Sequence, residues 1–315
     1  MSDKFEKIID PIDKEILKQE LSKERFGRYT GRGGNEIYII NHHNSPNVMK
    51  EIGRLREVSF RDAGGGTGMA IDIDEFDICE NCYEQLVVWD PVEEELVGGM
   101  RFIDCSHIVP ANDADEVPLS TSHYFNFSSK FRKEYLPYTI ELGRSWVQPN
   151  YQPSNNPRKG IYALDNIWDG LGLLTVIHPE MKYFFGKVTM YPDFHKESRD
   201  FILFLLRHYF PDDEGLVIPK HPIQTLTPDA KFEQIIKGLD FDKGYRAMTK
   251  FVRANGHTVP PLMNVYMHLS STMKSFGTAI NPDFGGVEET GIIVTIDDIY
   301  EDKTERHIKN IIQHK

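Results

Sequence analysis

The order of strand and helix patterns constrains the fold of this chain more than any other feature. Two strand patterns, at 83–90 and 95–104, flank a short acidic turn, which is typical of an antiparallel hairpin. A strand pattern at 138–148, a helix pattern at 158–177 and a strand pattern at 182–191 then follow one another. Strands that pair first as hairpins and are later separated by helices indicate an α+β domain with a mixed sheet.

The remaining patterns fill the chain without a repeat or a low-complexity linker. Ser45 as N-cap and Pro46 at the first helical position predict a helix that ends near residue 62. Further helices are expected at 3–24, 195–210, 242–255 and 261–276, another from Pro228, and further strands at 35–41 and 291–297. We expect one domain, 1–315, with a helical N-terminal arm, 1–34, before a core with a C-terminal extension, 35–315.

Charge and composition argue against several classes of protein. The formal net charge of −12 argues against general nucleic-acid binding. No apolar run approaches the roughly 18 residues of a membrane span, and the charged N-terminus has no apolar signal region. Three cysteines are too few for a disulfide framework. We therefore expect a cytoplasmic protein.

The stretch ELGRSWVQ places Glu141 and Arg144 around a single glycine, Gly143, inside a strand pattern. Side chains three apart on a regular strand face opposite ways. A bulge at Gly143 would add one residue, bring both side chains to one face, and free a backbone N–H from the neighbouring strand. Such a donor is what acyl transfer needs at the oxygen that gains charge. An ordinary ion pair between Glu141 and Arg144 is the alternative.

The segment NNPRKG, 155–160, leads from this strand into a helix pattern. Backbone amides at a helix N-terminus, with Arg158, Lys159 and Gly160 beside them, predict a phosphate site. A solvated helix start is the alternative. Together with the bulged strand, this loop suggests a protein that holds a thioester on a phosphopantetheine arm.

Two other motifs are interpreted as structural. CENC at 79–82, with Cys105 and His107, has the residue types of a zinc site but not the usual spacing, so no metal site is predicted. The glycine-rich GGGTGMA at 64–70 follows a helix rather than a strand, and so fails the context test for dinucleotide binding.

Six segments, taken in order, resemble one family. They are REVSFRD (56–62), DIDEFD (72–77), LVGGMRF (96–102), ELGRSWVQPNYQ (141–152), NIWDGLGLLTVIHPEMKYFFGKVTM (166–190) and PPLMNVYMHLSSTMKSFGTAINPDF (260–284). The chain resembles the GNAT-type N-acyltransferases, most closely the branch that makes ornithine lipids and glycine lipids, often labelled hemolysin-like. This branch is distantly related to the acyl-homoserine lactone synthases. The resemblance implies a mixed, mostly antiparallel GNAT-like sheet flanked by helices, with helical extensions at both ends.

The resemblance to the lactone synthases implies which residues build the acceptor side of the site. The matching positions are Arg56, Phe60, Asp74, Asp77, Arg101, Glu141 and Arg144. Without the motif, the acidic stretch could equally be a solvated loop or a cation site, and Arg101 could equally be structural or functional. RDAGGGTGMAI (61–71) replaces a bulkier, often aromatic segment of the relatives, which predicts a differently shaped acceptor pocket. The reduced phosphate loop, PRKG, favours an acyl carrier protein over coenzyme A as donor.

The implied reaction moves a long-chain (3-hydroxy) fatty acyl group from an acyl-carrier-protein thioester to the α-amine of glycine or ornithine. Acyl-phosphopantetheine is then a co-substrate, and no tightly bound cofactor is expected. Glu141 is predicted to act as the general base, Arg144 to orient it or hold a carboxylate, and Arg101 to clamp the acceptor's carboxylate. The acidic carrier protein is expected to dock on 130–133 and on Arg158 and Lys159.

Release of a lipid product predicts a transient contact with the inner face of the membrane, through an apolar stripe at 260–276. Packing of that stripe in the core is the alternative. Two other functions stay open: an autoinducer-type lactone synthase that takes its amine from S-adenosylmethionine, and a non-catalytic, lipid-binding or hemolysin-like protein. The 260–284 block argues against the first, and the lack of an apolar span against the second.

Overall fold

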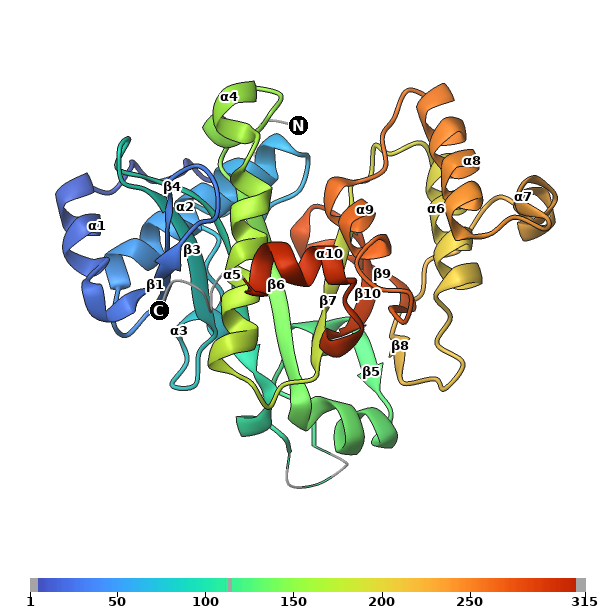
Figure 1. The fold of residues 1–315 in the computed structure, drawn as a ribbon, viewed down its shortest axis with the longest axis horizontal. Helices are drawn as coiled ribbons and strands as arrows, with labels where there is room; N and C mark the ends of the chain where they lie inside the picture. The colour runs from blue at the N-terminus through green and yellow to red at the C-terminus, as the bar shows by residue number, and fades with distance from the viewer. Residues whose placement is uncertain (1–4, 111, 113–114, 310–315) are drawn as a thin grey trace.

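The computed structural model describes residues 5–110, 112 and 115–309 (Figure 1). In this part of the chain, one eight-stranded sheet has the order β1-β2-β3-β4-β6-β7-β10-β9, and a second sheet pairs β5 with β8. The strands are β1 (Phe26–Tyr29), β2 (Glu36–Ile40), β3 (Glu84–Asp90), β4 (Glu95–Asp104), β5 (Phe125–Phe127), β6 (Thr139–Val147), β7 (Tyr183–Met190), β8 (Val217–Pro219), β9 (Lys274–Asn281) and β10 (Val287–Thr295). Only β6 and β7 pair in parallel. The mixed, mostly antiparallel sheet is confirmed.

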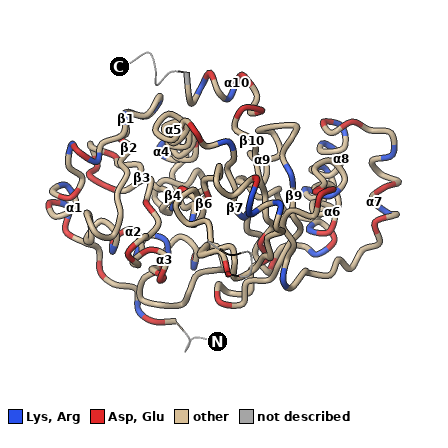
Figure 2. Tube along the Cα trace, turned by 90° about the horizontal axis from the view of Figure 1, so that it is seen from below, with Lys and Arg blue, Asp and Glu red and all other residues tan. Residues whose placement is uncertain are grey.

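Helices cover both faces of the large sheet. They are α1 (Lys14–Glu20), α2 (Pro46–Asp62), α3 (Glu75–Ile78), α4 (Pro157–Gly160), α5 (Ala163–Ile177), α6 (Lys196–Tyr209), α7 (Asp229–Ile236), α8 (Phe241–Ala254), α9 (Pro261–Met267) and α10 (Glu301–Thr304). Figure 2 shows α5 and α10 on one side of the strands, and α2 and α3 on the other. No helix of the described residues has the length and apolar character needed to cross a bilayer.

The alternation of side chains along β3 defines the two faces. Leu86 and Val88 belong to the core cluster that contains α5 and α6, whereas Val87 and Trp89 belong to the cluster that contains α2. Successive strand residues point to opposite faces, so each cluster fills one side of the sheet. We call these sides the α5 face and the α2 face.

The formation of α2 follows from its sequence. Ser45 and Pro46 start it as predicted, although the Ser45 hydroxyl donates to the Glu20 carbonyl instead of capping the helix. Val48 and Ile52 pack with β3 in the core of the α2 face. Four residues after Ile52, Arg56 lies on the same buried side and is fully enclosed. The helix thereby brings a charged group into the interior.

The helix expected at 3–24 is wrong over most of its length. Residues 3 and 4 lie outside the described part, and the described residues of this range are helical only in α1 and in a 3-10 turn at Lys23–Arg25. Pro11 disfavours a continuous helix because it lacks a backbone N–H and restricts the residue before it. The chain before α1 instead follows the 68–70 loop, where Glu6 N–H donates to Gly68 and Ile9 N–H to Ala70. β1, in the predicted N-terminal arm, is the edge strand of the large sheet.

The helix expected at 261–276 begins at Pro261 as predicted, but its second half is wrong, because α9 ends at Met267 and β9 begins at Lys274. Gly277, expected as the helix stop, lies within β9 at a φ of 87°, beside a register shift against β10. In the apolar stripe predicted for membrane contact, Tyr266, Leu269 and Met273 are buried, and Leu262 and Val265 are partly buried against the core. This supports the alternative of core packing, and the membrane contact stays a prediction.

Smaller differences concern element bounds. The helix expected at 158–177 is two helices, α4 and α5, and β10 begins at Val287 rather than at 291. The strands expected at 35–41, 83–90, 95–104, 138–148 and 182–191, and the helices at 46–62, 195–210 and 242–255, are confirmed within one residue at each end.

The large sheet opens between its two parallel strands. Thr139 to Leu142 of β6 pair with Tyr183 to Gly186 of β7, and the pairing ends there. β6 continues to Val147 and β7 to Met190, so their facing edges are unpaired beyond this point. We call this opening the fork.

A bulge lies in β6 where the fork begins. Arg101 of β4 pairs with Gly143, and Gly99 pairs with Trp146, so one residue of β4 faces two residues of β6. The predicted bulge is thus confirmed next to Gly143, but the left-handed residue is Arg144, at a φ of 48°. Gly143 itself has no positive φ, and a Cβ there would make only an ordinary contact, 3.4 Å from Nε of Arg101.

Candidate active site

Buried arginines and aspartates gather on the α2 face. Nη1 of Arg56 donates to Oδ2 of Asp77 at 3.0 Å, and Nη2 donates to Oε1 of Gln85 at 2.5 Å. Nη1 of Arg101 lies 2.7 Å from Asp74 and 3.2 Å from Asp77. Figure 2 shows acidic and basic positions together where α2 and α3 meet. Asp74 and Asp77 are held there by α3, because Asp74 is its N-cap and Asp77 closes a capping box.

Arg144 extends this cluster from the bulge. Its Nε lies 2.9 Å from Oδ2 of Asp72, and its Nη2 lies 3.6 Å from Asp74. Five predicted residues therefore come together: Arg56, Asp74, Asp77, Arg101 and Arg144. Asp72 is fully buried and was missed, although it begins the DIDEFD motif that supplied Asp74 and Asp77.

The charges of this cluster depend on one another. Burial raises the pKa of the Asp77 carboxyl, but the guanidinium groups of Arg56 and Arg101 outweigh burial and hold that pKa below its usual range. The paired carboxylates in turn raise the pKa of Arg101 against the effect of burial. A buried network of this kind is costly unless every member is paired, so each residue fixes the position of its neighbours.

Glu141 makes no ion pair with Arg144 in the described structure, so the ion-pair alternative is wrong. Its two oxygens instead accept hydrogen bonds from the Tyr83 hydroxyl, the Ser120 hydroxyl and the Thr121 N–H. Burial raises the pKa of Glu141, and the hydrogen bond from Tyr83 opposes that effect. A fully buried carboxylate with three donors is well suited to positioning its neighbours. The assignment of Glu141 as general base stays a prediction.

Aromatic rings from opposite ends of the chain cover Arg144. The ring of Phe284 lies 4.5 Å from the Arg144 guanidinium, and Phe60 meets Phe284 edge-on at 5.1 Å. The glycine-rich loop makes room for this contact, because a Cβ on Gly285 would lie only 3.1 Å from Gly65. Phe284 thus supplies an aromatic wall that the 61–71 segment itself lacks.

A second buried ion pair lies where the fork opens. The Lys187 ammonium of β7 donates to the Glu289 carboxylate of β10, and the Tyr124 ring lies 4.3 Å from the same ammonium. Burial lowers the pKa of Lys187, and the charge of Glu289 opposes that effect. Sequence reasoning missed this pair, although a lysine between apolar residues in YFFGKVTM was the available signal.

The residues of the predicted phosphate site belong to α4, beyond the end of β6. Arg158 is exposed, whereas Nζ of Lys159 lies 3.0 Å from Glu93. Gly160 is required here, because a Cβ would lie 2.5 Å from the backbone nitrogen of Pro153. The close packing of Gly160 holds α4 against the segment before it. Phosphate binding by these residues stays a prediction.

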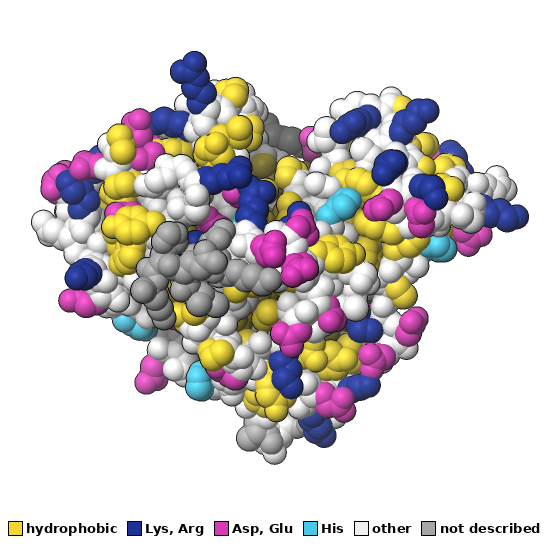
Figure 3. Space-filling view, in the orientation of Figure 1, with side chains coloured by type: hydrophobic (Ala, Val, Ile, Leu, Met, Phe, Trp, Pro, Cys, Tyr) yellow, Lys and Arg dark blue, Asp and Glu magenta, His cyan; other side chains and the backbone are white. Residues whose placement is uncertain are grey.

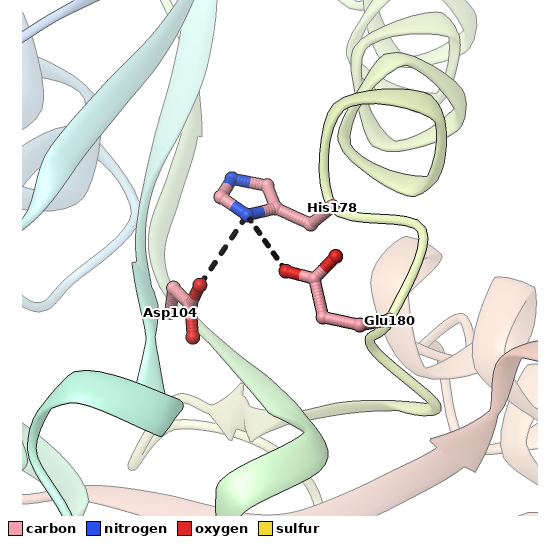
Figure 4. Close-up of side chains that lie close together, drawn as sticks. All are labelled: Asp104, His178 and Glu180. Carbon is pink, nitrogen blue, oxygen red and sulfur yellow. Dashed lines mark ion pairs between the residues drawn. The ribbon is translucent and has the colours of Figure 1, made fainter.

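The described residues contain one group with metal-ligand geometry, and no cysteine takes part in it. Nδ1 of His178 lies 3.4 Å from Asp104 and 3.9 Å from Glu180 (Figure 4). These distances equally fit ordinary polar contacts between a histidine and two carboxylates. Cys105 is buried and Cys79 exposed, and the zinc alternative gains no support.

Comparisons with known proteins agree with this architecture. The family described as "Acetyltransferase (GNAT) domain" matches residues 55–159, which include the C-terminal half of α2, the arginine–aspartate cluster and the bulge. A glycine N(alpha)-acyltransferase of Phocaeicola vulgatus is 52% identical over 309 residues, covering 98% of this chain and 94% of that protein. A glycine N(alpha)-acyltransferase of Bacteroides thetaiotaomicron is also 52% identical over 309 residues, covering 98% and 91% of the two chains. No solved structure matches.

Proposed function

The chain belongs to the family of GNAT acyltransferases that includes these two proteins, and on that premise we propose that it transfers a fatty acyl group to the α-amine of glycine. The identity of 52% across nearly the whole chain carries this proposal, since it extends far beyond the GNAT segment. The fork and the charged cluster beside it support it chemically. An acyl transfer needs a donor aligned with the amine and backbone groups near the oxygen that gains charge.

The donor that we propose is a long-chain, 3-hydroxylated acyl thioester on a phosphopantetheine arm, carried by an acyl carrier protein. The unpaired edges of β6 and β7 offer N–H and C=O groups to an extended arm of this kind. A cavity of about 310 Å³ next to α5 offers space for an apolar chain, with Trp168, Leu171, Phe184, Val265 and Leu269 among its lining residues. Val265 and Leu269 come from the segment whose membrane contact was predicted.

Mass spectrometry tests this function directly. Purified protein is incubated with a 3-hydroxypalmitoyl-carrier-protein thioester and an equimolar mixture of glycine, ornithine, lysine, serine and S-adenosylmethionine. We expect N-acylglycine as the main product. A lactone formed from S-adenosylmethionine would favour the autoinducer synthase instead. Vesicle lysis without consumption of the thioester would favour the non-catalytic alternative.

The carrier protein is acidic, so its docking surface on this chain should be basic. In the two basic clusters predicted from sequence, two lysines already have acidic partners: Lys130 pairs with Glu214, and Lys159 pairs with Glu93. The exposed side of α8 offers a second surface, whose basic residues recur at helical spacing: Lys243, Arg246, Lys250 and Arg253. In Figure 3 basic side chains gather over α8.

We expect the double reversal Arg246→Glu/Lys250→Glu to raise the KM for the acyl-carrier donor about tenfold, because rim charges mainly affect encounter. The KM for a minimal acyl-pantetheine donor should stay unchanged. Lys23→Glu/Arg32→Glu, two exposed positions near β1, is the matched control. An equal rise in both double variants would exclude α8 as the docking surface.

A further inference from the structure

We propose that Lys187, Glu289 and Asn281 form the binding site for the zwitterionic amino-acid acceptor. In this site Glu289 and Asn281 hold the ammonium group, and Lys187 holds the carboxylate. Glu289, in place of the predicted Glu141, then removes the proton that keeps the amine from reacting, and Lys187 takes the carboxylate-binding role predicted for Arg101. The inference rests on the proposed function and names the residues that would bind its acceptor.

The sheet register places this site at the fork. Leu142 of β6 pairs with Gly186 of β7, and Lys187 is the next residue after the pairing ends. Glu141 pairs with Phe185, so Lys187, two residues on, points to the α2 face with Glu141. On β10, Glu289 pairs with Thr189, so it also points to this face, diagonally from Lys187. The pair therefore meets the opening on the side of the predicted acceptor residues.

Burial makes a purely structural role for this pair costly. Glu289 is 3% exposed, and the Lys187 side chain is 10% exposed. A buried ion pair often stabilises a fold less than apolar residues of the same size would. Buried, perturbed charges that lie at an opening are more typical of functional sites.

Asn281 adds an independent observation. Its Nδ2 donates to Oε1 of Glu289 at 3.2 Å, whereas its Oδ1 is buried and has no hydrogen-bond partner. A buried carbonyl oxygen without a donor costs free energy. An ammonium group beside Glu289 would supply that donor, since it offers three N–H bonds and would need several acceptors.

The surroundings would favour proton removal from the amine. The groups that act on the pair come from several elements: Tyr124 and Tyr191 lie near Glu289, and Arg144 and Arg101 act on Lys187. Lys187, Arg144 and Arg101 oppose a further positive charge and so ease the loss of the amine's proton, whereas the carboxylates of Glu289 and Glu141, the latter also interacting with Lys187, hold the ammonium until Glu289 takes that proton. Both tyrosines have raised pKa values, mainly through burial, and stay neutral while this happens.

The step balances without any further reactant. The ammonium passes one proton to the Glu289 carboxylate, and the neutral nitrogen attacks the thioester carbon, forming the C–N bond. The C–S bond then breaks. A second proton leaves the nitrogen for the departing thiolate, the third stays on the amide, and Glu289 returns its proton to solvent.

Neighbouring residues of β10 provide a matched test. Glu288 is also buried and ion-paired, with Arg199 Nη1 2.7 Å away, but it points to the opposite face. Glu289→Gln should lower kcat/KM for glycine at least about a hundredfold, as expected for loss of a general base. The lost activity should return as pH rises, because the amine then arrives neutral. Glu288→Gln should change kcat/KM less than about threefold.

The carboxylate contact has its own control, the acceptor glycinamide, which keeps the amine and lacks the negative charge. Lys187→Met should raise the KM for glycine about a hundredfold and affect glycinamide little. Equal losses in Glu289→Gln and Glu288→Gln, or equal effects of Lys187→Met on both acceptors, would overturn the inference. If Glu289→Gln unfolds, Glu289→Asp takes its place. We expect this variant to retain activity and to show an altered pH profile. An unchanged pH profile would count against the site.

Calorimetry separates this inference from the proposed function. If the wild type acylates no glycine, the proposed function is wrong, and the binding site is then tested by glycine binding alone. Binding that Lys187→Met abolishes and Glu288→Gln leaves intact would support the site. Absent binding, or binding that is the same in all three proteins, would overturn it.

Discussion

Replacing Arg56 with leucine is expected to lower the free energy of unfolding by about 3–5 kcal/mol, because it removes one partner of a buried ion pair. The side chains of Arg56 and Asp77 are both fully inaccessible. Leucine would leave Arg101 as the cation beside Asp77, whose oxygens would still accept from Nε2 of Gln85 and the Asp74 N–H, and it would leave Oε1 of Gln85 without its donor. Urea denaturation of the purified variant, followed by circular dichroism, measures the loss.

The double variant Arg56→Leu/Asp77→Leu is the control for this prediction. It removes both charges, so it should be more stable than Arg56→Leu alone. The pH dependence should also change. The pKa of Asp77 is lower in the folded state, so its stabilising contribution is present above its unfolded pKa, about 3.9, and is lost as pH falls towards the folded value. Arg56→Leu should weaken this dependence, and equal stability of wild type and Arg56→Leu would show that Arg101 alone holds Asp77.

The second large effect is expected at Arg144, where side chain and backbone can be separated. The side chain joins the bulge to Asp72 and to the ring of Phe284, so its loss should shift the acceptor side and lower kcat/KM about a hundredfold. Arg144→Gly and Arg144→Ala should lose the same activity. At a φ of 48° alanine is strained and glycine is not, so the alanine variant should be about 1 kcal/mol less stable.

Kinetics with glycine and thermal unfolding of both variants check this prediction. A fully active Arg144→Gly would show that the bulge matters and the guanidinium does not. Equal stability of the two variants would show that the strand does not hold residue 144 in its left-handed conformation.

Local patterns predicted the part of the fold that depends on local chemistry. The acidic turn between 90 and 95, the proline at 46 and the glycine at 143 each act within a few residues, and the elements around them were predicted correctly. The arginine–aspartate cluster was predicted from its motifs, because Arg56, Asp74, Asp77, Arg101 and Arg144 match one family in type and order.

The missed features depend on contacts between distant segments. The apolar spacing within 261–276 is helical, so it predicts one long helix. The residues of β9 form a strand because they pair with β10, and spacing within 261–276 cannot show that pairing. Lys187 and Glu289 are 102 positions apart in sequence and meet only through the β7–β10 register. Likewise, nothing near Phe60 in sequence indicates that Phe284 will cover Arg144.

The fork also bears on solubility. Normally only the outermost strands of a sheet carry unpaired N–H and C=O groups, and such rims promote aggregation by accepting strands from other molecules. Here residues 143–147 and 187–190 are unpaired on one side, while β4 and β10 pair with their other sides. A strand of another protein molecule would have to insert between β6 and β7, in the middle of the sheet, to reach them. The fork thus leaves backbone groups unpaired without offering other protein molecules a template for aggregation.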